Sequence, residues 1–479
     1  MSDDPRPEVA PDPTEDAPAA AAPAHEAPAS SGLMAKLRQK LSGQEFLKHV
    51  LTLMTGTASA QVLQFVAMIF VARLFTPIEF GVYVLIMSAV STVVPIAAGR
   101  YELAIVLPRS DNDARQLLRL STWINVVVSL VTIVVMVWLG PTFAHLLTDQ
   151  SDPNAPAIER SLRNWLYAVG PIVWLVTQLG VMSYWLTRTK NFRQVAQNKI
   201  YQSGAVSGLQ IGTGLVGMGV SGLVLATVAG YLASLVNLMR NTRGQYRFDP
   251  DTAAPASKGA LARRYWKMPA LNGPNALVDA VRLNGINFLI AARYAGGPVG
   301  QFGMAWRLLQ APMGLINAAV SQVFFQRLAT VRRGQMTSIV WRAVLRSAVV
   351  GIIPFALIWW LSPWILPFVL GSQWQLAGDI ARVLVPWLYL NFITSPISTV
   401  FVVVKRQFTM LLFSIAYCVV PLTLIWVLPQ DLLATMNWVA WSMFGLLVVF
   451  VGLALLVSWQ YDRGFGRSAD EDEAEAAAW

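Results

Sequence analysis

Four polar side chains lie close together in a stretch that is otherwise apolar enough to cross a lipid bilayer. In residues 268–294, Asn272, Asn275, Asp279 and Arg282 are spaced by three, four and three. On a helix this spacing places them on one face. An ionisable group inside a membrane segment costs roughly 2.5–3.5 kcal/mol on insertion scales, so such a face must border protein or water. We therefore predict that the four residues line a central cavity in which Arg282 recognises an anion.

Three further polar residues extend this predicted cavity, and each has an alternative. Arg307, in the next apolar segment, completes a basic patch with Arg282 or else contacts Asp279 across helices. Asp279 has three possible roles. It modulates the anion recognition by Arg282, binds a coupling cation, or forms an ion pair with Arg282 that serves structure alone. Gln61 and Gln64 form a polar stripe on the first apolar segment. Helix–helix contact is the alternative for that stripe.

Arg100 and Glu102 lie where the second apolar segment ends. A charged pair at this level fits an inner gate that opens and closes the cavity, or an interfacial anchor. Neither these residues nor the rest of the chain form a recognisable catalytic or metal-binding pattern. The single cysteine, Cys418, and the three histidines have no metal-ligand spacing. We expect no catalytic residues, no metal and no cofactor.

The elements that position these residues must be membrane helices. The chain has 479 residues, of which 55% are hydrophobic and 13% charged, whereas about 25% are charged in soluble domains. Its mean hydropathy is +0.51. Against the ~20 residues needed to span a bilayer, we count twelve apolar segments. They are 51–74, 80–98, 117–139, 165–186, 200–216, 221–238, 268–294, 300–325, 344–370, 380–404, 408–428 and 436–461. The predicted fold is an all-α polytopic membrane protein.

The orientation follows from the loops, because cytoplasmic loops are enriched in Lys and Arg. With the N-terminus inside, 29 of the 36 Lys and Arg residues fall on inner segments and 5 on outer connections. The other two are Arg282 and Arg307. This split predicts that both termini are cytoplasmic. It also explains the formal net charge of +10 without a nucleic-acid partner.

The predicted domain organisation has two six-helix lobes around a linker. Residues 51–239 form the first lobe, 240–267 a cytoplasmic linker and 268–461 the second lobe. Residues 1–32 are a Pro/Ala-rich disordered tail, and 462–479 are an acidic cytoplasmic tail. Residues 33–50 suit an amphipathic segment on the cytoplasmic membrane surface, or the polar start of the first membrane helix. Because each lobe has an even number of helices, the second lobe starts on the same side of the membrane as the first. The two lobes therefore have the same orientation, as in a parallel repeat.

Two runs of sequence resemble a known family. They are ARLFTPIEFGVY at 72–83 and GRYELAIVLP at 99–108. Both are similar to Wzx-type polysaccharide and O-antigen flippases of the MOP exporter superfamily. The resemblance implies two pseudo-symmetric lobes and charged residues in the cavity. It also implies translocation of undecaprenyl-diphosphate-linked oligosaccharide across the bacterial inner membrane by alternating access, for O-antigen, capsule or exopolysaccharide synthesis.

The function expected from the sequence is therefore a flippase and not an enzyme. Its expected partners are a lipid-linked oligosaccharide, membrane lipids, and assembly proteins such as a polysaccharide polymerase. A drug/cation antiporter of the same superfamily is the close alternative, with Asp279 as its membrane carboxylate. A membrane polysaccharide polymerase or ligase is an alternative of another class. The stripe on 268–294 is expected to face the cleft between lobes, opposite Gln61 and Gln64, and Arg282→Ala should abolish export.

Overall fold

The computed structural model describes residues 55–248, 250, 254–294, 297–329, 334–404, 406–428 and 431–464. The predicted tail 1–32, the predicted amphipathic segment 33–50 and most of the predicted acidic tail 462–479 lie outside these residues. Within the described residues every regular element is a helix. "Inner" and "outer" below mean the sides assigned by the Lys and Arg distribution.

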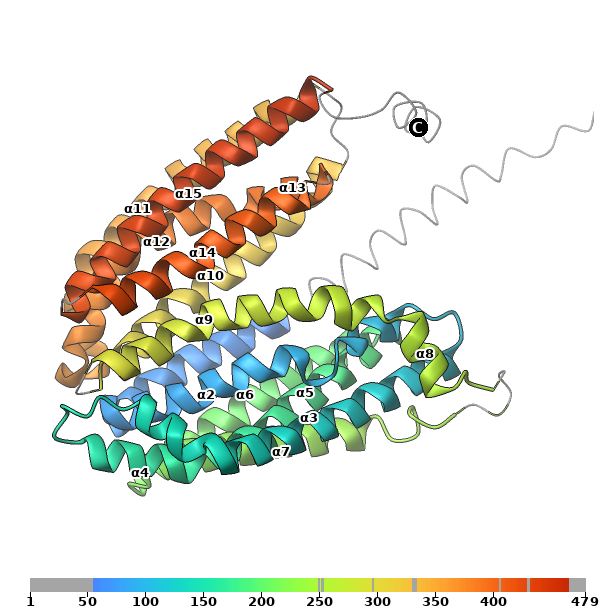
Figure 1. The fold of residues 1–479 in the computed structure, drawn as a ribbon, viewed down its shortest axis with the longest axis horizontal. Coiled ribbons are helices and arrows are strands. Elements are labelled where there is room, and N and C mark those ends of the chain that lie inside the picture. The colour runs from blue at the N-terminus through green and yellow to red at the C-terminus, as the bar shows by residue number, and fades with distance from the viewer. Residues whose placement is uncertain are drawn as a thin grey trace, which may run out of the picture. The chain divides into compact units, whose positions relative to one another are not determined.

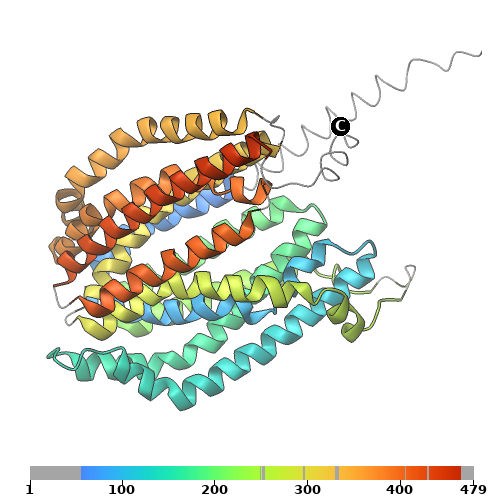
Figure 2. The same cartoon turned by 45° about the horizontal axis from the view of Figure 1, so that its top comes forward.

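The first lobe begins with a membrane helix at Thr55–Leu74. Its other elements are α2 (Pro77–Ala97), η1 (Tyr101–Val106), α3 (Asp111–Leu146), α4 (Ala155–Trp165), η2 (Leu166–Ala168), α5 (Val169–Arg188), α6 (Phe192–Leu215) and α7 (Gly219–Asn241). In this lobe α6 packs on α7 and α3 on α5 (Figure 2, blue to green).

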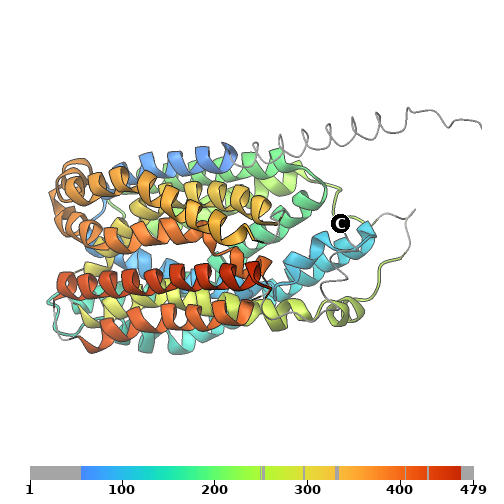
Figure 3. The same ribbon diagram turned by 90° about the horizontal axis from the view of Figure 1, so that it is seen from above.

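The second lobe follows the short helix α8 (Lys258–Arg264). Its elements are the π-helical turn η3 (Met268–Asn272), α9 (Gly273–Arg293), α10 (Pro298–Ala329), α11 (Met336–Leu370), η4 (Ser372–Trp374), α12 (Gln375–Ile397), α13 (Val400–Val403), α14 (Gln407–Val427) and α15 (Leu432–Asp462). Here α11, α12 and α15 pack together (Figure 3, orange to red), and α14 packs against α9.

The predicted fold class is confirmed. The described residues contain twelve helices of twenty residues or more, and nine of them are long and apolar enough to cross a membrane. The other three are α6, α9 and α10. Polar side chains lower the hydropathy of α6 and α9, as the stripe on α9 illustrates, and much of α10 lies outside the side chains that the structure describes.

The hairpin between the first two membrane helices is fixed by local chemistry. Thr76 accepts a hydrogen bond from the backbone N–H of Glu79, and the Glu79 carboxylate accepts one from the N–H of Thr76, at 3.3 and 2.8 Å. This is a capping box, and Pro77 supplies the first helical residue without an N–H to satisfy. The chain therefore reverses within two residues of Leu74.

The linker between the lobes is docked on the first lobe. The N–H of Ala256 donates to the Asp113 carboxylate at 2.9 Å, and the Tyr101 hydroxyl donates to the carbonyl of Ala262 at 3.3 Å. Leu261 of α8 is buried in a cluster with residues of η1, α3 and α5. The start of the second lobe is thus held at the inner end of the first.

The lobes meet where α2 packs against α9 and α10 (Figure 1). The sequence-based expectation placed the first membrane helix opposite α9, and the structure gives α2 this position. The first membrane helix instead bonds to α6, through Ser203 Oγ to the carbonyl of Ala60 at 2.8 Å and Lys199 Nζ to Thr57 Oγ1 at 3.3 Å. α2 is consequently the element that positions the boundary between lobes.

Candidate substrate cavity between the lobes

A cavity of about 250 Å³ lies at the boundary between the two lobes. Its lining residues come from α2 and α7 of the first lobe and from α9 and α10 of the second. They are Phe80, Tyr83, Val84, Met87, Ser88, Ser91, Tyr231, Asn284, Asn287, Gly303, Trp306 and Arg307. The α2 residues recur at helical spacing, so one face of α2 supplies them. The cavity therefore joins amide, hydroxyl, aromatic and guanidinium groups from both lobes.

Arg307 is the charged residue of this wall. Its side chain is exposed, although it lies within a membrane helix. No carboxylate among the described residues lies within salt-bridge distance of it. A guanidinium offers five donors in a planar fork and stays protonated at any physiological pH. Arg307 is thus available to an anion that enters the cavity.

The amide of Asn287 connects the two lobes across the cavity. Its Nδ2 donates to Ser88 Oγ at 2.9 Å. Its Oδ1 is buried without a hydrogen-bond partner among the described residues. A buried unpaired acceptor is costly, by about 1–3 kcal/mol.

Tyr83 is held in the wall by a buried network. Its hydroxyl lies 3.1 Å from Thr227 Oγ1, and Gln210 Nε2 donates to both oxygens at 3.2 Å. Thr227 in turn donates to the carbonyl of Leu223 at 2.7 Å. A satisfied buried network of this kind fixes side-chain positions. The Tyr83 ring therefore presents a rigid surface to the cavity.

Arg282 does not line this cavity. It contacts the Asp279 carboxylate at 3.4 Å and lies over the Tyr417 ring, 5.3 Å from its centroid. It borders a much smaller cavity inside the second lobe, of about 10 Å³. The Trp306 ring lines both cavities and so separates Arg282 from Arg307. Of the two predicted arginines, the structure places Arg307 at the lobe boundary and Arg282 behind the wall.

The remaining predicted cavity residues are dispersed. Asn272 at the end of η3, and Asn275 and Asp279 on α9, are exposed and are not among the residues that line the cavity. On the first membrane helix Gln64 is exposed, and Gln61 is half-buried with an Oε1 that has no partner in the part of the chain that the structure describes. Neither glutamine lines the cavity described here.

The sequence reasoning missed the pair that faces the first lobe, Asn284 and Asn287. A signal was present, because these amides are spaced by three within the same apolar segment. The residues contributed by the first lobe had no comparable signal. Serine, as at Ser88 and Ser91, is small and common in membrane helices, and a tyrosine such as Tyr83 in an apolar segment does not by itself indicate a cavity.

The predicted inner gate lies at the inner end of the first lobe. Arg100 Nη1 and the Glu102 carboxylate are 3.8 Å apart, and both side chains are largely buried. Arg100 has a φ of 59°, in the left-handed region that non-glycine residues rarely adopt. Arg100 Nε and Glu102 Oε2 are buried without partners among the described residues. The pair is held under strain between α2 and α3, away from the cavity lining.

Burial raises the pKa of the Glu102 carboxyl, and its own backbone and Arg100 offset part of this desolvation. A folded-state pKa above the unfolded one means that folding favours the protonated acid. Stability should therefore be highest below the ordinary Glu pKa of about 4.3 and fall as the pH rises through the raised value. Glu102→Gln removes this fall. We therefore compare the difference in melting temperature, variant minus parent, at two pH values. We expect this difference to be more positive at neutral pH than near pH ~4. An equal difference at both pH values would contradict the assignment.

At the outer end the two lobes are in direct backbone contact. A Cβ built on Gly300 of α10 would lie 1.9 Å from the carbonyl oxygen of Pro77 and 2.9 Å from the nitrogen of Gly81. Only glycine permits this approach of α10 to α2. Farther along the same crossing, a Cβ on Gly303 would meet Val84 at 2.7 Å. The outer half of the boundary is therefore closed by glycine packing.

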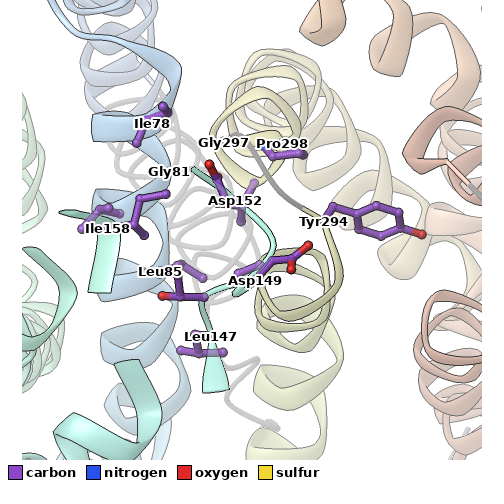
Figure 4. A pocket seen from close by; sticks show the side chains of 14 residues that line it. Ile78, Gly81, Leu85, Leu147, Asp149, Asp152, Ile158, Tyr294, Gly297 and Pro298 are labelled. Carbon is purple, nitrogen blue, oxygen red and sulfur yellow. The ribbon is translucent and has the colours of Figure 1, made fainter. Parts of the chain in front are cut away.

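A loop from the first lobe covers this closed end. Figure 4 shows Asp152, from the connection between α3 and α4, beside Gly297 and Pro298 at the start of α10, and Asp149 of the same loop nearer Leu85. Asp152 is buried and accepts a hydrogen bond from the N–H of Asn154 at 2.8 Å. The space that remains among these residues is only about 30 Å³.

The first membrane helix is also tied to the second lobe at its outer end. Trp374 Nε1 donates to the carbonyl of Ala72 at 2.7 Å, and Arg73 Nε donates to the carbonyl of Val369 at 2.9 Å. These contacts, the glycine crossing and the loop close the same end. The cavity with Arg307 lies beneath them, so the described state is closed on the outer side.

Comparisons with known proteins agree with this architecture. A family model described as polysaccharide biosynthesis protein matches residues 70–378. The lipid II flippase MurJ in an inward closed conformation has 11% sequence identity and a TM-score of 0.65, over 86% of this chain and 90% of that one. An inward-facing multidrug resistance MATE family transporter of the MOP superfamily has 15% identity and a TM-score of 0.64, over 85% and 94%.

A further solved structure is a MOP superfamily transporter from Pyrococcus furiosus, with 15% identity and a TM-score of 0.55, over 87% of this chain and 95% of that one. At these identities the likeness concerns the fold. None of the curated proteins compared matches the chain.

Proposed function

We propose a function from one premise: this chain belongs to the polysaccharide biosynthesis protein family. As a multi-pass transporter with the MOP superfamily fold, it translocates an undecaprenyl-diphosphate-linked oligosaccharide across the bacterial inner membrane by alternating access. Both termini are cytoplasmic in this proposal, and the product serves a surface polysaccharide such as O-antigen, capsule or exopolysaccharide. Membrane lipids and assembly proteins such as a polysaccharide polymerase are its proposed partners.

The observation that carries the proposal is Arg307 in the cavity between lobes, which has no carboxylate within salt-bridge distance among the described residues. A diphosphate is a compact anion, and the guanidinium fork matches phosphate oxygens. Asn284 and Ser91 of the same wall can bond glycan hydroxyls. The rings of Tyr83 and Trp306 offer flat apolar faces to the C–H groups of a sugar. The wall thus suits a substrate that is both anionic and rich in hydroxyls.

The closed outer end suggests the direction in which the substrate is transported. With Gly300 packed on Pro77, a substrate reaches the cavity from the inner side or from the bilayer. Opening the outer contact would then release it to the outer leaflet. Alternating access requires two such states of similar free energy, and the glycine crossing is the element that must separate between them.

The charge of the cavity disfavours the drug/cation antiporter. None of its described lining residues is acidic, and Arg307 repels a cationic drug. Asp279, the carboxylate expected for such an exporter, is exposed and lies outside this lining. The polymerase or ligase alternative also loses support, since the solved structures of similar fold are a flippase and transporters.

Reconstitution in proteoliposomes tests the proposal. A fluorescent undecaprenyl-diphosphate-linked oligosaccharide should move between leaflets faster than in protein-free vesicles. The organic cation ethidium should move no faster than in those vesicles. Transport of ethidium without movement of the glycolipid would favour the antiporter and refute the proposed function.

A further inference from the structure

A second cavity, of about 270 Å³, lies beside the first on the opposite side of the α2–α9 contact. Its lining is apolar: Leu85, Ala89, Thr92, Val93, Met136, Phe143, Leu147, Leu166 and Phe288. Thr92 supplies the one hydroxyl among these described residues, and it donates to the carbonyl of Ser88 at 2.8 Å. This space, called the apolar groove here, therefore offers a ligand no free polar group.

Both cavities are lined by residues of α2 and α9. On α9 the neighbouring residues Asn287 and Phe288 line the polar cavity and the apolar groove, respectively. On α2 Ser88 and Ala89 divide in the same way. The hydrogen bond from Asn287 to Ser88 thus closes the seam between a polar and an apolar compartment.

The seam contains a buried amide oxygen, that of Asn287. Asn287 Oδ1 is buried at this seam and has no partner among the described residues. A seam meant to stay closed gains stability when such an acceptor is paired or replaced by an apolar group.

The third wall of the groove borders lipid. Met136 and Phe143 come from α3, on which Val135, Val137 and Leu139 are exposed apolar residues. Exposed apolar side chains on a membrane helix face hydrocarbon chains. The apolar groove therefore connects the α2–α9 seam with the hydrocarbon side of α3.

We propose that the apolar groove binds the first, phosphate-proximal part of the polyprenyl tail while Arg307 holds the diphosphate in the polar cavity. This inference rests on the proposed function and adds a tail site to it. The substrate is amphipathic, and its two parts are joined covalently. The two compartments match these parts in chemistry and adjoin at the α2–α9 seam, so the tail leaves the cavity there.

Filling the groove tests this site. Ala89→Phe adds a ring at the groove wall, and Val134→Phe places the same ring on an exposed part of α3. The probes are an undecaprenyl-diphosphate-linked oligosaccharide and a soluble analogue with the same glycan diphosphate on a short alkyl group. We expect Ala89→Phe to weaken binding of the long-tailed probe about tenfold. The ring would displace about two methylene groups of the tail from the groove, and burial of each contributes about 0.8 kcal/mol to binding. Binding of the short-tailed probe to Ala89→Phe, and of both probes to Val134→Phe, should stay unchanged.

Several results would overturn the tail site. One is unchanged affinity of Ala89→Phe for the long-tailed probe, and another is an equal loss for both probes. Competition by a plain phospholipid as strong as that by the long-tailed probe would assign the groove to bulk lipid. If the parent protein binds neither probe, the proposed function itself fails. Ala89→Leu, a smaller addition, repeats the test should the Phe variant not fold.

Discussion

Arg307→Ala should lower translocation of the lipid-linked oligosaccharide about 10- to 100-fold, because a charge-assisted hydrogen bond is worth about 1.5–3 kcal/mol. Arg307 is the charged residue of the described cavity lining and has no carboxylate partner there. Removing it leaves the diphosphate without a counter-charge in a site of reduced dielectric. The measurement is the transfer rate in proteoliposomes at equal amounts of inserted protein. Arg307→Lys should retain part of the rate, because it keeps the charge and loses the planar fork.

Arg282→Ala is the matched comparison, since it removes the same charge from the same lobe. The sequence alone predicted that Arg282→Ala abolishes export. In the structure Arg282 already has Asp279 at 3.4 Å and the Tyr417 ring as partners, behind Trp306. We therefore expect the smaller loss from Arg282→Ala. A larger loss there than in Arg307→Ala would mean that the anion lies inside the second lobe.

The helices could be predicted because their signal is local. Each apolar segment has to bury its backbone within itself, so length and hydropathy suffice to find it. Segments weakened by polar residues, such as 268–294, were still found because the rest of the segment is long and apolar. The resemblance to polysaccharide flippases rested on runs that a family model also covers, and it is confirmed.

The cavity could be predicted only in part, because its composition depends on helix rotation and on the identity of each neighbour. Arg282 and Asn287 are five residues apart on α9, yet one faces α14 and the other faces α2. The sequence of residues 268–294 does not indicate which helix packs against which face of α9. Of the residues that the sequence singled out, Arg307 lines the described cavity, and the α9 residues that line it, Asn284 and Asn287, are not those of the predicted stripe.

Close backbone approaches are also absent from any local pattern. Gly300 and Gly81 are separated by more than two hundred residues, and each looks like an ordinary helix glycine. Their importance comes from the carbonyl of Pro77, which only the folded chain brings to Gly300. The docking of residues 254–267 on the first lobe likewise depends on distant partners such as Asp113.

Gly300→Ala should prevent closure of the outer end and stop export while the protein still inserts. The added methyl group would lie 1.9 Å from the carbonyl oxygen of Pro77, and neither the Cβ nor this backbone oxygen can rotate away. Overpacking of this kind typically costs about 1–3 kcal/mol. Against two states of similar free energy, that is enough to move most molecules to the open one. The variant should therefore rest with its outer end open.

Thiol labelling measures this shift directly. In a Cys418→Ser background, Ser91→Cys places one thiol in the cavity wall. A membrane-impermeant maleimide added from the outer side should label it in the Gly300→Ala variant and leave it unlabelled in the parent. Gly208→Ala on α6 is the control, since a Cβ there meets nothing within 4 Å. Equal labelling of the two proteins, together with normal export by Gly300→Ala, would show that the glycine crossing is not the outer closure.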